Sequence, residues 1–206
     1  MHQGRDYKLE SCVVSLAQAI DAQERGADRV ELCIRLETEG MTPDVQLVTS
    51  LCDALHIPVR VMVRATEEGY AADASVLQQM IDSIESLKHL PLDGFVIGVM
   101  KDNHIDREAM ITLLHHAYPF HVTFHKAIDM SDDIVDDIEW LNQFVQVDTL
   151  LTSGGAIKAV DGIDQLREIK ALFIGHVMAA GKITPEVLDG LHDALGLQWY
   201  HGSSIV

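Results

Sequence analysis

The stretch LESCV at residues 9–13, followed by RVELC at residues 29–33, decides the fold of this chain. Both runs are strand-like, and residues 15–25 between them have apolar side chains at helical spacing. The region predicts a β-α-β unit. Alternate side chains share a face of a strand, so Glu10 points the same way as Cys12, and Glu31 the same way as Cys33. If the strands are parallel neighbours, the two cysteines lie side by side at their carboxyl ends.

The same alternation of apolar runs and helical patterns continues to the end of the chain. We expect further strands at residues 58–64, 94–99, 121–125, 149–152, 173–178 and 198–201, and helices at residues 43–55, 73–90, 106–117, 132–144, 162–170 and 185–195. The second helix is predicted to begin with Thr42 as its cap and Pro43 in its first turn.

Eight strands separated by helices indicate an α/β protein, a (β/α)8 barrel of the TIM type. An open doubly wound sheet is the alternative, because periodicity cannot show whether the sheet closes. The chain stops five residues after His201, so we expect the eighth helix to be missing. A second subunit would then cover that part of the barrel, which predicts a homodimer.

Composition limits the possible partners. The 206 residues form one predicted domain, residues 1–206, with no evident linker. The 32 acidic against 15 basic side chains argue against nucleic acid or an anionic membrane surface as a partner. Three cysteines are an odd number, which disfavours a secreted disulfide framework and favours the cytoplasm. No export signal or apolar run long enough to span a bilayer is evident, so we expect a soluble protein.

The predicted carboxyl ends of the strands are unusually polar. They carry Glu10, Cys12, Glu31, Cys33, Arg64, His125, Lys126, Asp129, Thr152, Ser153 and His201. Each residue taken singly is most often a packing residue. Barrel interiors, however, are normally filled with aliphatic side chains. A large number of polar groups at one end therefore needs mutual pairing or a ligand. Their joint placement predicts a functional site there.

One chemistry for this site is metal binding. Barrel closure would place His201, Cys12 and Cys33 on three adjacent strands. Thiolate and imidazole are ligands that copper(I) and zinc accept, so we predict a copper(I) site with Glu10 or Glu31 next to it. Cys52 falls on the apolar stripe of a predicted helix and is interpreted as a core residue.

The other chemistry is catalysis on a small anion. Three late loops contain small residues whose backbone N–H groups could face an anion: Ser153, Gly154 and Gly155; Gly181 and Lys182; and Gly202 and Ser203. Arg64 is a candidate anchor for a carboxylate or phosphate, and His125 a candidate acid or base. Glu10, Glu31 and Asp129 complete the candidate catalytic set. This hypothesis predicts a lyase, isomerase or hydrolase acting on a phosphorylated or carboxylated metabolite.

Several segments together resemble the CutC family, which is linked to copper homeostasis. They are residues 9–12, 26–33, 40–43, 61–64, 121–130 and 151–155. The resemblance covers nearly the whole chain and implies a cytoplasmic, often dimeric TIM barrel, with copper(I) held by cysteines at the positions of Cys12 and Cys33. Three rim segments depart from the family pattern: residues 65–70 after Arg64, Lys126 where arginine is usual, and residues 179–182 where proline and three glycines are usual. The favoured interpretation is a copper homeostasis protein, with the enzyme as the alternative.

Overall fold

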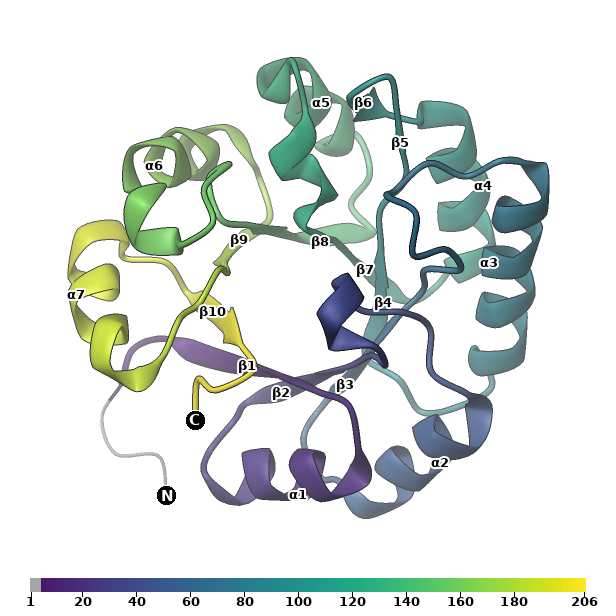
Figure 1. Ribbon diagram of the computed structural model, residues 1–206, viewed down its shortest axis with the longest axis horizontal. Coiled ribbons are helices and arrows are strands. Elements are labelled where there is room, and N and C mark those ends of the chain that lie inside the picture. Colours follow the sequence, from purple (N-terminus) through teal and green to yellow (C-terminus); the bar gives the residue numbers. More distant parts are fainter. Residues whose placement is uncertain (1–4) are drawn as a thin grey trace.

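The computed structural model describes residues 5–206 and contains a closed barrel of parallel strands (Figure 1). Around the barrel the strands follow the order β1-β10-β9-β8-β7-β4-β3-β2. Their bounds are β1 Lys8–Val13, β2 Arg29–Leu32, β3 Val59–Met62, β4 Gly94–Ile97, β7 His121–Phe124, β8 Val147–Thr152, β9 His176–Ala179 and β10 Trp199–Gly202. Because β1 pairs with β10 as well as with β2, the sheet closes, and the open-sheet alternative is wrong.

In the described part of the chain, seven α-helices cover the outside of the barrel (Figure 1). They are α1 Leu16–Glu24, α2 Val45–Ala54, α3 Ala74–Leu87, α4 Arg107–Ala117, α5 Ile134–Leu141, α6 Ile163–Leu172 and α7 Pro185–Leu195. Within residues 5–206, no α-helix follows β10, as the sequence predicts. The ring of helices is therefore open between α7 and α1, where the C-terminus lies (Figure 1).

The predicted elements are confirmed, but some of their boundaries differ. Asp44, not Thr42, caps α2, because its side chain accepts a hydrogen bond from the Leu47 amide (2.8 Å). The strand expected at residues 173–178 begins only at His176. The sequence patterns also missed the hairpin of β5 (Met100–Lys101) and β6 (His104–Ile105), and the 3-10 turns η1 (Leu36–Thr38), η2 (Lys126–Met130) and η3 (Ala159–Asp161), which are too short to show a period.

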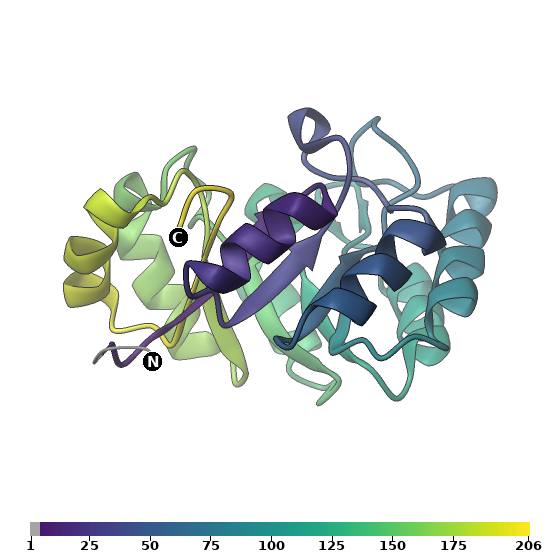
Figure 2. The same cartoon turned by 90° about the horizontal axis from the view of Figure 1, so that it is seen from below.

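The apolar core lies mainly between the strands and the helices, whereas the barrel interior is partly polar. Two small apolar clusters occupy the interior: Cys12, Cys33, Met62 and Val96; and Leu151, Met178, Ala180 and Trp199. The η1 turn projects beyond the barrel at the carboxyl ends of the strands (Figure 2). Among the helices in residues 5–206, none combines the length and apolar character needed to cross a bilayer.

A charged network fills the amino end of the barrel. Arg60, 1% exposed, donates to Asp93 (2.7 Å) and to both oxygens of Asp148 (2.7 and 2.8 Å). Its guanidinium also reaches the hydroxyl groups of Thr123 (2.6 Å) and Thr149 (3.1 Å). Burial disfavours the charge, but Asp148 and Asp93 outweigh burial and raise the Arg60 pKa further. Through one cation the network joins β3, β7 and β8 to Asp93, the residue before β4.

Candidate functional site at the carboxyl end of the barrel

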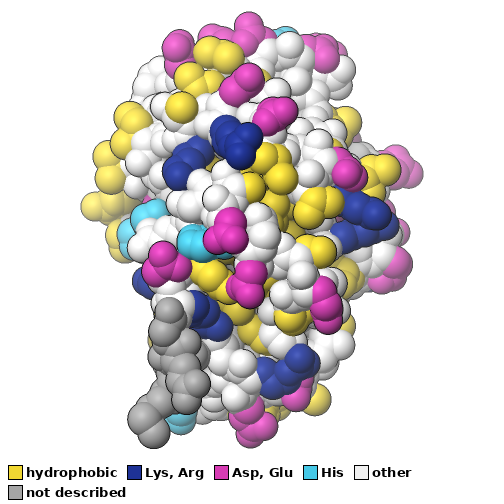
Figure 3. All heavy atoms as spheres, turned by 90° about the vertical axis from the view of Figure 1, so that its left-hand side faces the viewer, with side chains coloured by type: hydrophobic (Ala, Val, Ile, Leu, Met, Phe, Trp, Pro, Cys, Tyr) yellow, Lys and Arg dark blue, Asp and Glu magenta, His cyan; other side chains and the backbone are white. Residues whose placement is uncertain are grey.

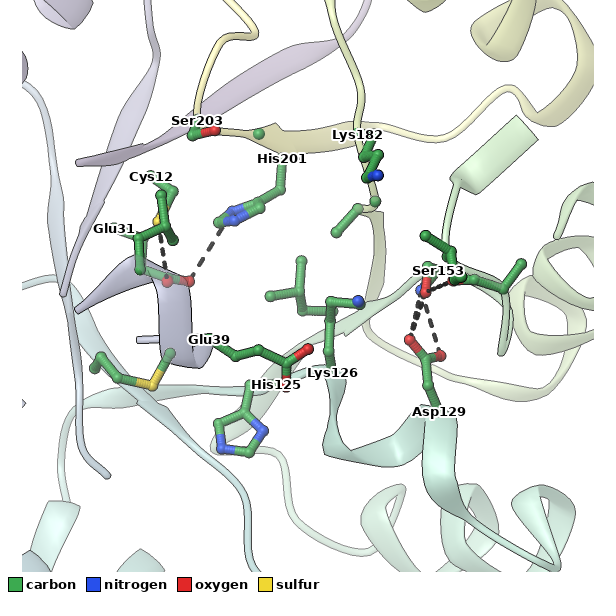
Figure 4. Close-up of a pocket in the computed structure, with 18 of the residues that line it drawn as sticks. Cys12, Glu31, Glu39, His125, Lys126, Asp129, Ser153, Lys182, His201 and Ser203 are labelled. Carbon is green, nitrogen blue, oxygen red and sulfur yellow. Dashed lines mark hydrogen bonds and ion pairs between the residues drawn. The ribbon is translucent and has the colours of Figure 1, made fainter. Parts of the chain in front are cut away.

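A cavity of about 610 Å³ opens at the carboxyl ends of the strands (Figure 4). Of the residues predicted from the sequence, its lining includes Cys12, Glu31, His125, Asp129, Ser153, Gly155, Lys182, His201, Gly202 and Ser203. Five others do not line it: Glu10, Cys33, Arg64, Thr152 and Gly154. Most of the predicted residues therefore surround one space, in the position where barrel proteins build their sites.

The two predicted cysteines meet next to this cavity. The Sγ atoms of Cys12 and Cys33 are 3.6 Å apart, and Cys12 Sγ lies 3.8 Å from Glu31 Oε1. The hydrogen bond to Cys33, burial and the Glu31 charge all raise the pKa of Cys12. All three cysteines are free, and the half-buried Cys52 packs against the main apolar core, as predicted. Cys12 and Cys33 thus form a buried thiol pair with one member at the cavity wall.

Glu10 lies behind the cavity wall and orients His201. It is fully buried, forms an ion pair with Arg29 and lies 2.8 Å from His201 Nδ1. Burial raises the pKa of Glu10, but Arg29 and His201 outweigh it and lower the value to about 2. The carboxylate therefore stays ionised and fixes the imidazole, whose other nitrogen is left for a ligand.

Glu31 is the least satisfied carboxylate of the site. Its Oε2 atom is buried without a hydrogen-bond partner among residues 5–206, and lies 4.0 Å from His201 Nδ1. Burial, together with the charge of Glu10, raises the pKa of Glu31 to about 7, although His201 opposes this shift. Burial lowers the pKa of His201, but Glu31 and Glu10 outweigh it and raise the value. The site therefore holds a carboxyl that exchanges its proton near neutral pH beside an imidazole whose pKa is raised.

The possible metal ligands form two groups that share Glu31. Cys12, Glu31 and Cys33 have ligand atoms within 4.8 Å of one another, and so do Glu10, Glu31 and His201. The predicted set of Cys12, Cys33 and His201 is thus divided between the two groups, with Glu31 between them. The sulfur pair suits a soft cation such as copper(I), whereas the oxygen and nitrogen atoms suit a harder one.

His125 presents an unpaired nitrogen in the same cavity. Its Nδ1 accepts a hydrogen bond from the Ala127 amide (3.2 Å), whereas its buried Nε2 has no partner within residues 5–206. Burial and the charge of Arg64 lower its pKa to about 3, so the ring is neutral and Nε2 carries the hydrogen. A Cβ atom at Gly98 would lie 2.5 Å from the ring, so glycine is needed for the ring to fit.

Arg64 organises loops instead of facing the cavity. Its guanidinium donates to the carbonyl oxygens of Gly40 (3.0 Å), Gly69 (3.1 Å) and Thr38. It also lies over the ring of Tyr70, 4.9 Å from the centroid. These contacts hold the segment after β2 against the segment after β3, and they occupy donors that a substrate anion would need. Arg64 as a substrate anchor stays a prediction.

Asp129 likewise organises a neighbouring loop. It accepts hydrogen bonds from the backbone amides of Ser153 (3.0 Å) and Gly155 (3.1 Å), and from Thr152 Oγ1. The Gly154 amide donates to Thr152 Oγ1 (2.9 Å). Figure 4 shows Asp129 beside Ser153 at the edge of the cavity. In the first of the three loops expected to face an anion, the backbone N–H groups of Ser153, Gly154 and Gly155 are therefore bonded within the protein.

Two polar residues of the site were not singled out from the sequence. Arg29 neutralises Glu10, and Glu39 lines the cavity. Arg29 lies two residues before Glu31, so the strand alternation alone places it on the inner face. Glu39 follows the η1 turn, which has no recognisable sequence period.

A closed parallel (β/α)8 barrel with a polar cavity at the carboxyl ends of its strands defines a protein of the TIM-barrel class. Within this class, residues 7–206 match the CutC family, and the chain belongs to that family.

Relatives found by sequence and by structure agree with this family assignment. The chain is 31% identical over 201 residues to the human protein named copper homeostasis protein cutC homolog. The aligned region covers 96% of this chain and 73% of the human protein. It is 35% identical to a CutC family protein from Pasteurella multocida, over 79% of this chain and 66% of that protein. A CutC crystal structure from Streptococcus agalactiae superposes with a TM-score of 0.92 at 25% identity, covering 97% of this chain and all of that chain.

Proposed function

We propose that the chain acts in copper homeostasis by binding copper(I) through Cys12 and Cys33. The observation that carries this proposal is the 3.6 Å separation of the two sulfur atoms on adjacent strands. Copper(I) is a soft cation, so it prefers two converging thiolates over the carboxylate oxygen atoms found elsewhere in the site. The names of the human and mouse relatives, which refer to copper homeostasis, support the same assignment.

The neighbouring groups fit this role. Cys12 lines the cavity, so an incoming ion meets it before the fully buried Cys33. Binding requires the thiols to lose their protons, and Glu31, with its pKa of about 7, lies next to Cys12 as a proton acceptor. We infer that His201, oriented by Glu10, is the third group near the ion.

A competition titration with a copper(I) chelator under anaerobic conditions tests the proposal. We expect the native protein to bind one equivalent, and the Cys12→Ser/Cys33→Ser variant to bind at least 100-fold more weakly. Cys52→Ser is the matched control, because Cys52 lies on α2 and is expected to leave binding unchanged. Binding that is weak in the native protein, or indifferent to the two cysteines, contradicts the proposal.

A second candidate function is catalysis on a small phosphorylated or carboxylated metabolite. It is favoured by two buried groups without partners in the described chain, Glu31 Oε2 and His125 Nε2, which belong to residues lining the same cavity. A carboxyl with a pKa of about 7 can exchange a proton at neutral pH, and a neutral imidazole N–H can donate a hydrogen bond. A lyase, isomerase or hydrolase reaction would use these two groups. Its test is a metabolite screen in which Glu31→Gln and His125→Gln abolish turnover.

The cellular setting and assembly complete the proposal. We place the protein in the cytoplasm, where reducing conditions keep thiols such as Cys12 and Cys33 available for metal. Acidic side chains are spread over the face seen in Figure 3, and Lys and Arg appear there only in small groups. This distribution of charge does not favour binding of a nucleic-acid backbone on that face. The homodimer stays a prediction that sedimentation analysis can test.

A further inference from the structure

Two lysines at the cavity lack the partners that most cations of this chain have. Lys126 is half-buried and belongs to η2, and Lys182 is exposed and follows β9. Neither has a hydrogen bond or an ion pair within residues 5–206, although the chain has 32 acidic side chains. Both lie around the same opening in Figure 4. The cavity thus gathers unpaired positive charge in a strongly acidic protein.

The carboxylates at the cavity already have other partners. Glu10 forms an ion pair with Arg29, and Asp129 is bonded to backbone amides. Glu39 accepts a hydrogen bond from the hydroxyl group of Tyr70. The nearby carboxylates therefore do not pair with the two lysines.

Two further atoms point to a ligand independently of the lysines. His125 Nε2 and Glu31 Oε2 are buried, and neither has a partner in the described part of the chain. An unmade buried hydrogen bond costs roughly 1–3 kcal/mol, so a ligand that satisfies both atoms would recover that cost. The two atoms lie on β2 and just after β7, so a single ligand would have to reach across the cavity from one to the other.

We propose that Lys126 and Lys182 hold the phosphate or carboxylate group of a small metabolite, whose other polar end contacts Glu31 and His125. The proposal rests on the second candidate function and names the residues that bind the anionic group of its substrate. The lysines, and not the glycine loop after β8, are the anion-binding groups, because Asp129 and Thr152 occupy the N–H groups of that loop. Two point charges tolerate either kind of oxyanion.

The cavity sets the size and character of this ligand. Its volume of about 610 Å³ lies in the range of small-molecule sites, roughly 300–1,000 Å³. Leu36, Met62, Leu151 and Ile157 form an apolar part of the wall. A ligand with a carbon skeleton between an oxyanion and a hydrogen-bonding group fits this lining better than inorganic phosphate alone.

Calorimetric titration of the native protein with inorganic phosphate, phosphoglycolate and malonate tests the proposal. We expect at least one of the two organic anions to bind more tightly than inorganic phosphate, and Lys126→Met/Lys182→Met to weaken it at least tenfold. Lys101→Met on the β5–β6 hairpin is the matched control, since it removes an exposed lysine that does not line the cavity.

The outcomes separate this proposal from the copper proposal. If the double lysine variant retains copper(I) binding and loses anion binding, the result supports both the copper proposal and the anion-site proposal. The anion site is overturned if no probe binds at millimolar concentration, or if Lys101→Met weakens binding as much as the double variant does. It is also overturned if phosphoglycolate and malonate bind the double lysine variant as tightly as the native protein. The anion titrations alone do not test the thiol pair.

Discussion

The two ends of the barrel both bury charged groups, but they differ in how completely those groups are paired. At the amino end, Arg60 donates hydrogen bonds to Asp93, Asp148 and two threonine hydroxyl groups. At the carboxyl end, Glu31 and His125 each keep one buried atom without a partner among the described residues. Fully paired charges are typical of a structural network, whereas unpaired buried atoms are typical of a ligand-binding site.

Removing the central cation of the amino end should have the largest effect. Arg60→Met leaves Asp93 and Asp148 without their shared partner, and we expect a loss of about 3–5 kcal/mol in the free energy of unfolding. Urea unfolding monitored by circular dichroism measures it. Lys101→Met, an exposed lysine, should change stability by less than about 0.5 kcal/mol. A loss below about 1 kcal/mol for Arg60→Met would show that the amino end is not a structural network.

The carboxyl end should be more stable without its ionised Glu31. The pKa of Glu31 is raised from 4.5 to about 7 on folding, so its contribution to stability is complete below pH 4.5 and is lost as the pH rises through 7. The loss amounts to roughly 3 kcal/mol at most. Glu31→Gln should therefore stabilise the protein at pH 8 relative to the native chain, and less so at pH 5. Equal effects at both pH values would refute the raised pKa.

Filling the space beside His125 should produce a smaller loss. The Cβ of Gly98→Ala would lie 2.5 Å from the ring, and overpacking of this kind costs about 1–3 kcal/mol. Gly190→Ala on α7 is the matched control, because nothing lies within 4 Å of its Cβ position. We expect Gly190→Ala to be neutral or to stabilise the protein by about 0.5–1 kcal/mol. Thermal unfolding of the two variants distinguishes a crowded ring from a tolerant one.

His125 itself should show no titration near neutral pH. Its pKa is lowered to about 3 by burial and Arg64, so the ring should stay neutral from pH 5 to pH 8. The ring signals in nuclear magnetic resonance spectra, assigned by comparison with His125→Gln, provide the measurement. A midpoint between pH 6 and pH 7 would mean that the ring is not buried as the structure describes.

The sequence predicted much of this site because the barrel converts alternation into position. Glu-x-Cys in each of the first two strands places four side chains on the inner face, and barrel closure adds His201 next to Glu10. The sequence could not show what each group contacts. Arg64 looked like an anchor for an anion, yet its donors are bonded to carbonyl oxygens of two loops. Those loops have no periodic pattern from which their path could be predicted.

The sequence by itself determined the order of strands and helices, the inner face of each strand and the family to which the chain belongs. These properties follow from local periodicity and from motifs that are contiguous in the chain. Only the tertiary structure decided that the sheet closes, that the Cys12 and Cys33 sulfur atoms come within 3.6 Å, and that Glu31 lies between two groups of ligands. Pairing, burial and pKa depend on contacts between residues far apart in the sequence, and a local pattern does not record them.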